Sequence, residues 1–216
     1  MISKENEHTL AFDENSNEYI NIDLSWEMEA VKDIETQLGL YDAVIVASGV
    51  GVSTLWPLRE GEELPFKFVR GQNLYYKRAD IDIGKAAVLC GEYVCPIGDD
   101  LVCGATHEYG ELLDIENKPP NMEQAKALLD EKITRLVPKM DQSNPYKSKA
   151  GIRVASQRTH LGKLPVIAEH PLHPGRLWLL TGFGSRGLIH HALLGRTLAN
   201  AIVLKEAIPE ELCSNL

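Results

Sequence analysis

Apolar residues recur at helical spacing in three stretches of the chain. The first stretch follows a capping residue, Ser25, and stops at Gly39. In the second stretch Asn121 is placed to cap the helix, and Gln124 three residues later completes a capping box. The third stretch is longer and mostly apolar. Helices are therefore predicted over residues 25–38, 121–137 and 188–205.

Shorter apolar or alternating runs predict strands in the rest of the chain. Two runs, 43–47 and 177–180, are apolar throughout and lead toward glycine turns, which is typical of buried parallel strands. Between them the pattern alternates, and Gly91 and Gly98 interrupt it as turns do. Residues 141–150 are predicted to form a polar loop. The other strands are expected over residues 66–69, 73–77, 86–89, 93–97, 101–105 and 151–156.

The order of these runs predicts an α/β to α+β fold. Each end of the chain holds a buried strand followed by a glycine turn, so we expect the two ends to meet in one partial three-layer domain. The strand-rich middle would then form an inserted, mostly antiparallel sheet. The expected divisions are an acidic tail at 1–22, the partial domain at 23–60 and 150–216, and the inserted domain at 61–149.

The excess of negative charge lies mainly at the N-terminal end. The net charge is −9, and residues 1–40 hold ten acidic and two basic side chains. This balance argues against nucleic acid or an anionic membrane as partner. The sequence has no run of about 18 apolar residues, which a membrane-spanning helix needs. Residues 1–7 lack the features of a signal or transit peptide, so the cytoplasm or an organelle matrix is the expected location.

Cysteine and histidine spacing predicts no metal site. The four cysteines form no C-x-x-C pair. His170 and His173 lie in a proline-rich turn, and no third ligand is in register with them. His190 and His191 are adjacent in a predicted helix, so their rings point about 100° apart.

A glycine-rich turn joins the last predicted strand to the last helix. Residues 182–187 fit G-x-G-x-x-G, but no second strand follows the helix, so this is not the first turn of a dinucleotide-binding unit. A helix start still offers free N–H groups and a positive dipole end, and Arg186 adds charge. The turn therefore suits an anion or a carbonyl group as ligand. The alternative is that its glycines serve only the close packing of the strand against the helix. A weaker glycine turn at 49–54 follows the first buried strand, and both turns could face one crevice.

Taken together, four segments of the chain resemble the C-terminal half of the D-amino-acid oxidase-like family of FAD-dependent oxidoreductases, which includes glycine and sarcosine oxidases. Their order and spacing match over about residues 41–205. The family's first βαβ unit, with its pyrophosphate-binding glycine turn, has no counterpart in this sequence. The four segments are residues 41–49, 69–72, 101–108 and 176–188.

The resemblance implies FAD as cofactor. The turn at 182–188 would contact the pyrimidine end of the flavin, where the helix dipole stabilises negative charge on the reduced ring. Arg153 looks like the family arginine that holds a substrate carboxylate, with a surface ion pair as the alternative. Arg186 would lie at the flavin or substrate side. The implied cofactor-binding residues are Gly49, Gly71, Gln72, Gly182, Phe183, Gly184, Ser185, Gly187 and Leu188.

The implied reaction is oxidation of a C–N bond in a small-molecule amine or amino acid. An imine would form, and oxygen or another acceptor would reoxidise the flavin. Two other interpretations remain open: a truncated, non-catalytic relative that acts as a binding or regulatory subunit, and one chain of a heteromeric flavin oxidase. A missing N-terminal half or a partner chain would supply the FAD pyrophosphate site. Residues 155–165 depart from the family pattern and lack its aspartate, so the substrate stays open.

Overall fold

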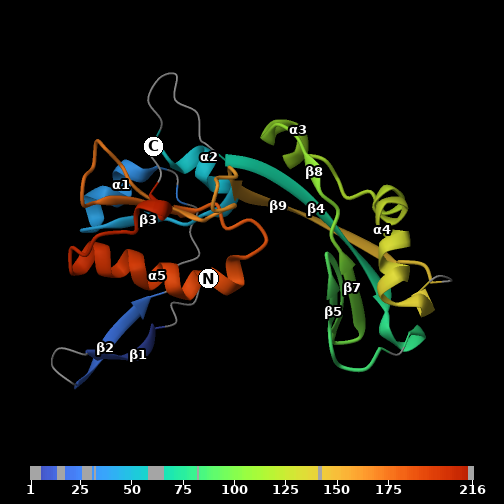
Figure 1. Ribbon diagram of the computed structural model, residues 1–216. Coiled ribbons are helices and arrows are strands. Elements are labelled where there is room, and N and C mark those ends of the chain that lie inside the picture. Colours follow the sequence, from blue (N-terminus) through green and yellow to red (C-terminus); the bar gives the residue numbers. More distant parts are fainter. Residues whose placement is uncertain are drawn as a thin grey trace. The chain divides into compact units, whose positions relative to one another are not determined.

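The computed structural model in Figure 1 divides the chain into two units, Met1–Ile34 and Glu35–Leu216. In the first unit two strands, β1 and β2, pair as an antiparallel hairpin in which Asn6 lies opposite Ser25. Their bounds are Asn6–Asp13 for β1 and Glu18–Ser25 for β2. The residues that the structure describes are 6–13, 18–25, 31, 33–57, 66–81, 83–140 and 143–213.

This hairpin differs from the acidic tail and the early helix that the sequence predicted. The apolar residues Ile20, Ile22 and Leu24 alternate with polar ones, and this period of two specifies a strand. Ser25 ends that strand instead of capping a helix. Residues 26–30 and 32 of the predicted helix lie outside the described residues. The first described helix, α1 (Ile34–Leu40), runs through Gly39.

A three-stranded sheet in the second unit joins two distant parts of the chain. The central strand β11 pairs in parallel with β3, with Leu177 opposite Val44, and pairs antiparallel with β10. The predicted parallel relation of the two buried runs is therefore confirmed. The helix α5 packs on this sheet through Leu194 and Leu198. The bounds are Val44–Val46 for β3, Val166–Glu169 for β10, Leu177–Thr181 for β11 and Gly187–Val203 for α5.

A larger, antiparallel sheet has the strand order β5-β6-β7-β4-β8, and β9 also pairs with β4. Figure 1 shows β4 and β9 running side by side along this sheet. The mixed architecture confirms the predicted fold class. Bounds are Phe66–Lys77 for β4, Val88–Cys90 for β5, Glu92–Ile97 for β6, Asp100–Gly104 for β7, Glu108–Tyr109 for β8 and Lys147–Ser156 for β9. The remaining α-helices are α2 (Val52–Leu55), α3 (Leu112–Glu116) and α4 (Met122–Leu136).

Two strand predictions need correction. The pattern predicted a break between residues 69 and 73, but β4 continues through them because Arg70 and Gln72 are buried in the sheet. It also predicted a loop at 141–150, whereas β9 begins at Lys147. Lys147 and Lys149 hid the strand because they lie on the face opposite to the one that α4 covers. The expected domain division between 149 and 150 falls inside β9.

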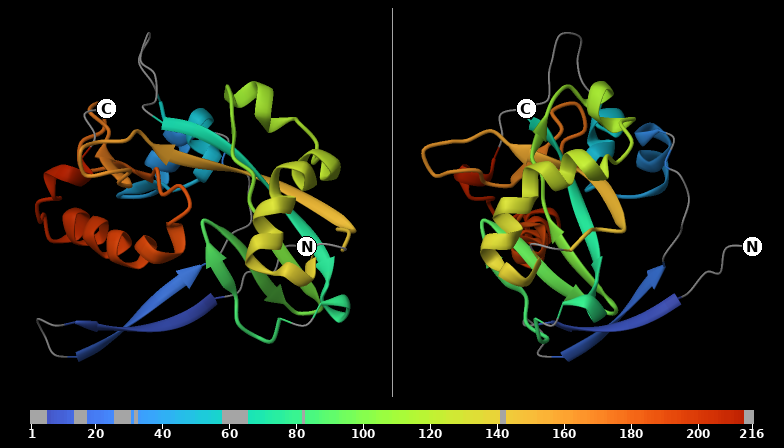
Figure 2. Two further views of the ribbon diagram at one scale, coloured as in Figure 1. Left: turned by 45° about the vertical axis from the view of Figure 1, so that its right-hand side comes forward. Right: turned by 90° about the vertical axis from the view of Figure 1, so that its right-hand side faces the viewer.

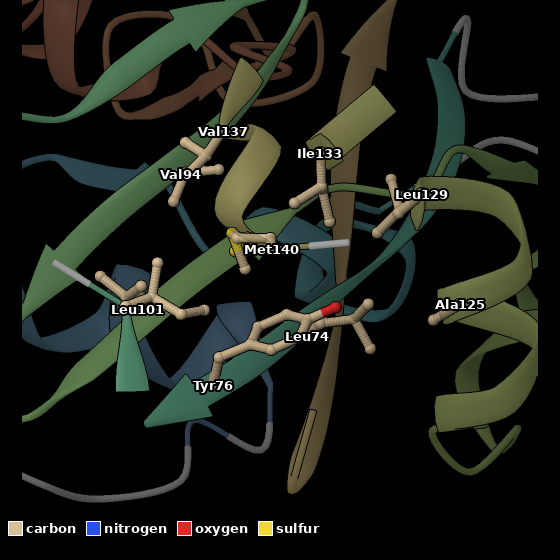
Figure 3. Packing of buried hydrophobic residues seen from close by; sticks show 11 residues of the cluster. Leu74, Tyr76, Val94, Leu101, Ala125, Leu129, Ile133, Val137 and Met140 are labelled. Carbon is tan, nitrogen blue, oxygen red and sulfur yellow. The ribbon is translucent and has the colours of Figure 1, made fainter. Parts of the chain in front are cut away.

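One face of the large sheet is covered by α4, which Figure 2 shows from two further directions. The Asn121 side chain accepts a hydrogen bond from the Gln124 amide at 2.9 Å, so the predicted cap is confirmed. The second bond of the predicted capping box would join the Asn121 amide to the Gln124 side chain. The Asn121 amide donates instead to Gln72 Oε1 at 2.6 Å. Below the helix lies the main core, shown in Figure 3: Leu74, Tyr76, Ile81, Val94, Leu101, Cys103, Ala125, Leu129, Ile133, Val137 and Met140.

None of the helices in the described part of the chain is both long and apolar enough to cross a membrane.

Candidate cofactor and substrate site

The opposite face of the large sheet carries polar and charged side chains. Side chains alternate along a strand, so the residues that flank each α4-covered residue in the same strand point away from α4. Gly71 pairs with Gly151 and Asn73 pairs with Lys149 in the β4–β9 register. We call this side the open face. Its members on β4 and β9 are Val69, Gly71, Asn73, Tyr75, Lys147, Lys149, Gly151, Arg153 and Ala155.

The predicted glycine turn is joined to the end of β9 by backbone hydrogen bonds. The Gly184 amide donates to the Val154 carbonyl at 2.9 Å, and the Ser156 amide donates to the Gly182 carbonyl at 3.4 Å. Ala155 and Phe183 also form a β-bridge. These bonds hold the turn next to the open face, two residues along β9 from Arg153.

A pocket of about 300 Å³ opens at this junction. Ala155 contributes to its wall, and so do residues 182–186 of the glycine turn. Arg158, Lys163 and Arg186 supply three cations, and no acidic residue stands among the described residues that line it. No motif marks Arg158 and Lys163, although both add basic charge within ten residues after Arg153. The pocket therefore favours an anionic or electron-rich group.

Glycine is required at this turn for two physical reasons. Gly182 has φ 76° and Gly184 has φ 56°, values that side-chain-bearing residues rarely adopt. A Cβ on Gly182 would also lie 3.3 Å from the Cβ of Ser156. Gly187 then begins α5, and Arg186 before it forms no side-chain capping bond. The Ile189 amide donates to the Arg186 carbonyl at 3.0 Å, so the amides of Gly187 and Leu188 are the ones that can bind an electron-rich atom.

Arg153 is held over a glycine in the open face. A Cβ on Gly71 would lie 2.6 Å from Arg153 Nη2, so a side chain at this position would displace the guanidinium. The same nitrogen donates to the Thr106 carbonyl at 3.3 Å. Within the described part of the chain no carboxylate forms an ion pair with Arg153, which leaves its charge available to a ligand.

Tyr93 lies within electrostatic reach of this arginine and is bonded to Asn73, and the sequence pattern did not single out either residue. The Tyr93 hydroxyl donates to Asn73 Oδ1 at 2.8 Å, and both residues pair with Gly104 across the sheet. Burial raises the pKa of Tyr93, and the bond with Asn73 and the charge of Arg153 partly oppose this. Side chains alternate between the two faces of β6, and this alternation could indicate Tyr93 only once it is known which face of the sheet is open.

Gln72 lies on the covered face, where its polar atoms bind other residues of the chain. It is fully buried, and its Nε2 donates to Glu108 Oε1 at 2.7 Å. Arg70 Nη1 donates to Glu108 Oε2 at 2.7 Å, which completes a buried polar network. Burial alone would raise the pKa of Glu108, but bonds from Gln72 and Thr106 and the Arg70 charge outweigh it and hold that pKa below its ordinary value. The contacts of Gln72 are therefore structural.

The remaining predicted cofactor residues lie outside the 300 Å³ pocket. Gly49, with φ 57°, follows β3, and the parallel register places it at the same sheet edge as the glycine turn. Leu188, in the first turn of α5, is 91% exposed. Gly71 lies beneath Arg153 and not in the pocket. The structure thus brings together residues 182–186, Ala155, Arg153 and Gly71. The turn Gly49–Gly51 also contacts β9, whereas Leu188 and Gln72 lie apart from this group.

Comparison with known proteins decides the family. Residues 21–201 match the family described as FAD dependent oxidoreductase. The chain belongs to this family. That membership, and FAD as the cofactor on which the family depends, confirm what the sequence segments implied.

Relatives within this FAD-dependent family show how much of a complete enzyme the chain spans. It is 30% identical over 171 residues to the bifunctional tRNA 5-methylaminomethyl-2-thiouridine biosynthesis protein MnmC of Caulobacter sp. strain K31, covering 79% of this chain and 26% of that protein. It is 30% identical over 169 residues to glycine oxidase of Pseudomonas aeruginosa, covering 77% and 43%. The crystal structure of glycine oxidase from Geobacillus kaustophilus matches with a TM-score of 0.59 at 27% identity, covering 76% and 42%. The chain therefore spans less than half the length of these relatives.

Proposed function

We propose that the chain carries the flavin-ring and substrate-facing half of an oxidoreductase that oxidises a C–N bond in a small amine or amino acid. One observation carries the proposal. Arg153, without a carboxylate partner among the described residues, lies on the open face two residues from Ala155 of the glycine-turn pocket. A guanidinium held in one place binds a carboxylate through two parallel hydrogen bonds. A substrate carboxylate on Arg153 would thus bring its amine carbon toward that pocket.

The glycine turn fits the ring of a flavin. Residues 182–186 line the pocket of about 300 Å³, which offers space to one end of a flat ring. The start of α5, which has no side-chain cap, and Arg186 favour negative charge on the carbonyl end of that ring. When bound, FAD supplies the acceptor for the hydride that leaves the substrate carbon. This chain's residues then orient the substrate, through Arg153, and stabilise charge, through the helix start. The substrate becomes an imine, which water hydrolyses.

We also propose that a polypeptide segment outside the described residues completes the FAD site. Among the described strands, β3 pairs only with β11, so one of its edges stays open, and Ile45 is 46% exposed. On α5, Leu188, Ile189 and Leu193 are 91%, 76% and 65% exposed. The matched relatives are longer than this chain, which covers 26% of the Caulobacter protein and 43% of the Pseudomonas glycine oxidase, so they have the additional sequence such a surface needs. A missing N-terminal half or a partner chain would provide the pyrophosphate cradle.

A flavin titration tests both parts of this proposal. If the chain contacts only the ring, riboflavin, FMN and FAD should bind with dissociation constants within about threefold of one another. A site that also held the phosphates would gain about 1.5–3 kcal/mol for each charge-assisted hydrogen bond and would prefer FAD more than a hundredfold. Quenching of flavin fluorescence at about 0.15 M salt, where exposed charges are screened, measures all three constants.

The outcomes of this titration are distinct. A strong preference for FAD would place the phosphate cradle within this chain and refute the completing segment. Absence of flavin binding, with no carboxylate binding at Arg153, would favour the non-catalytic interpretation instead.

Replacing Gly71 with alanine should move Arg153 and weaken carboxylate binding at least tenfold. The new Cβ would meet Arg153 Nη2 at 2.6 Å and the Thr106 carbonyl oxygen at 3.1 Å. Benzoate titration followed by NMR provides the measurement. Gly151→Ala is a matched control, because Gly151 pairs with Gly71 but has no atom within 4 Å of its own Cβ position. Equal losses in both variants would show that Arg153 does not hold the carboxylate.

A further inference from the structure

A second cavity lies farther along the open face, at the end of β9 away from the glycine turn. Its volume is about 500 Å³, and it spans β4, β6 and β7. Tyr75 and Tyr93 provide aromatic walls, and Leu89 and Ile97 provide apolar ones. Leu89 is 73% exposed and Ile97 is 60% exposed, so these apolar surfaces are accessible to a ligand. The cavity therefore suits an aromatic or aliphatic group.

Two charged residues line this cavity, and only one of them is neutralised. Asp100 accepts a hydrogen bond from the Tyr146 hydroxyl at 2.8 Å and forms an ion pair with Lys77 at 3.3 Å. Lys149 has its ammonium 5.6 Å from the centre of the Tyr75 ring, and no carboxylate among the described residues pairs with it. The unbalanced charge of the cavity is therefore positive, and Lys149 carries it.

Lys149 and Arg153 lie on the same face of β9, four residues apart. At the rise of a strand this separates their Cα atoms by roughly 13 Å. Their long side chains can reach toward each other across Tyr93, which lines the cavity and lies within electrostatic reach of Arg153. Lys149 thus lines the aromatic and apolar cavity, and Arg153, outside its lining, lies within electrostatic reach of Tyr93 in its wall.

From this arrangement we infer that the preferred substrate has two anionic groups separated by an apolar or aromatic spacer. Its amino-acid carboxylate binds Arg153, the spacer occupies the 500 Å³ cavity, and Lys149 binds the second anion. Lys149 is thereby a specificity-determining residue. This inference rests on the proposed function, because it takes Arg153 as the site of the first carboxylate.

Two probes that differ by one carboxylate test the inference. N-benzylglycine has a carboxylate, an amine and a ring, and N-(4-carboxybenzyl)glycine adds a second carboxylate on the far side of the ring. With excess FAD present, calorimetry should show the second probe binding wild type about tenfold more tightly, the gain from one charge-assisted contact. In Lys149→Gln the two probes should bind equally well.

Lys147→Gln is the matched control. Lys147 lies on the same strand and face, and its ammonium is likewise 5.6 Å from the Tyr75 ring centre, but it does not line the cavity. This variant should keep the tenfold preference. Equal binding of the probes to wild type, or a preference that survives in Lys149→Gln, would overturn the inference. In Arg153→Gln both probes should weaken together; if wild type binds neither probe, the proposed role of Arg153 fails and the inference fails with it.

Discussion

Replacing Gly182 with alanine is expected to remove flavin binding from the chain and to lower its free energy of unfolding by only about 1–2 kcal/mol. The residue has φ 76°, and a Cβ there would lie 3.3 Å from the Ser156 Cβ and 3.6 Å from the Val166 amide nitrogen. The turn would have to shift away from β9, and the pocket would lose its shape. Flavin fluorescence gives the affinity, and urea denaturation gives the stability.

Gly175→Ala separates backbone strain from loss of the pocket. Gly175 has φ 74°, nearly the value at Gly182, but nothing lies within 4 Å of the position of its Cβ. This variant should lose about 1 kcal/mol of stability and keep its flavin affinity. If Gly182→Ala also kept its affinity, the glycine turn would not be the flavin site.

Replacing Arg70 with methionine is expected to lower the free energy of unfolding by about 3–5 kcal/mol at pH 7. The guanidinium is 1% exposed and binds Glu108 at 2.7 Å and the carbonyls of Lys118 and Pro119 at 2.9 and 2.8 Å. Its removal leaves a largely buried carboxylate without its main cationic partner. Lys77→Met breaks an exposed ion pair with Asp100 and should cost at most about 1 kcal/mol. Similar losses in the two variants would contradict the importance of the buried network.

The same network predicts how stability changes with pH. The pKa of Glu108 is lower in the folded chain than in the unfolded chain, so the unfolded state takes up a proton first as pH falls. The stabilisation from Glu108 is complete above the ordinary glutamate pKa of 4.5 and is lost as pH falls through the lower folded value. Urea denaturation from pH 7 to pH 3 should show wild type losing more stability than Glu108→Gln. If the stability of the two proteins fell equally with pH, Glu108 would not be the source of the acid-dependent loss.

Local signals in the sequence determined several elements of this protein. The apolar runs that lead to glycine turns predicted β3 and β11 as parallel neighbours, and the register confirms the pairing. The expected burial holds for most of β11 but not for β3, where Ile45 is 46% exposed. Asn121 and Gln124 predicted the start of α4, since a helix cap depends only on residues three apart. Four short segments were enough to indicate the family. These features rest on patterns that extend over a few residues.

Only the tertiary structure decided which side of each strand faces the core. Lys147 and Lys149 suggested a loop, since polar residues in a strand make sense only when one face is left open. Gln72 and Gly71 are adjacent in sequence, yet pairing with β9 directs Gln72 into the buried network and leaves Gly71 beneath Arg153. The candidate site depends on contacts between residues about eighty positions apart, and no local pattern records them.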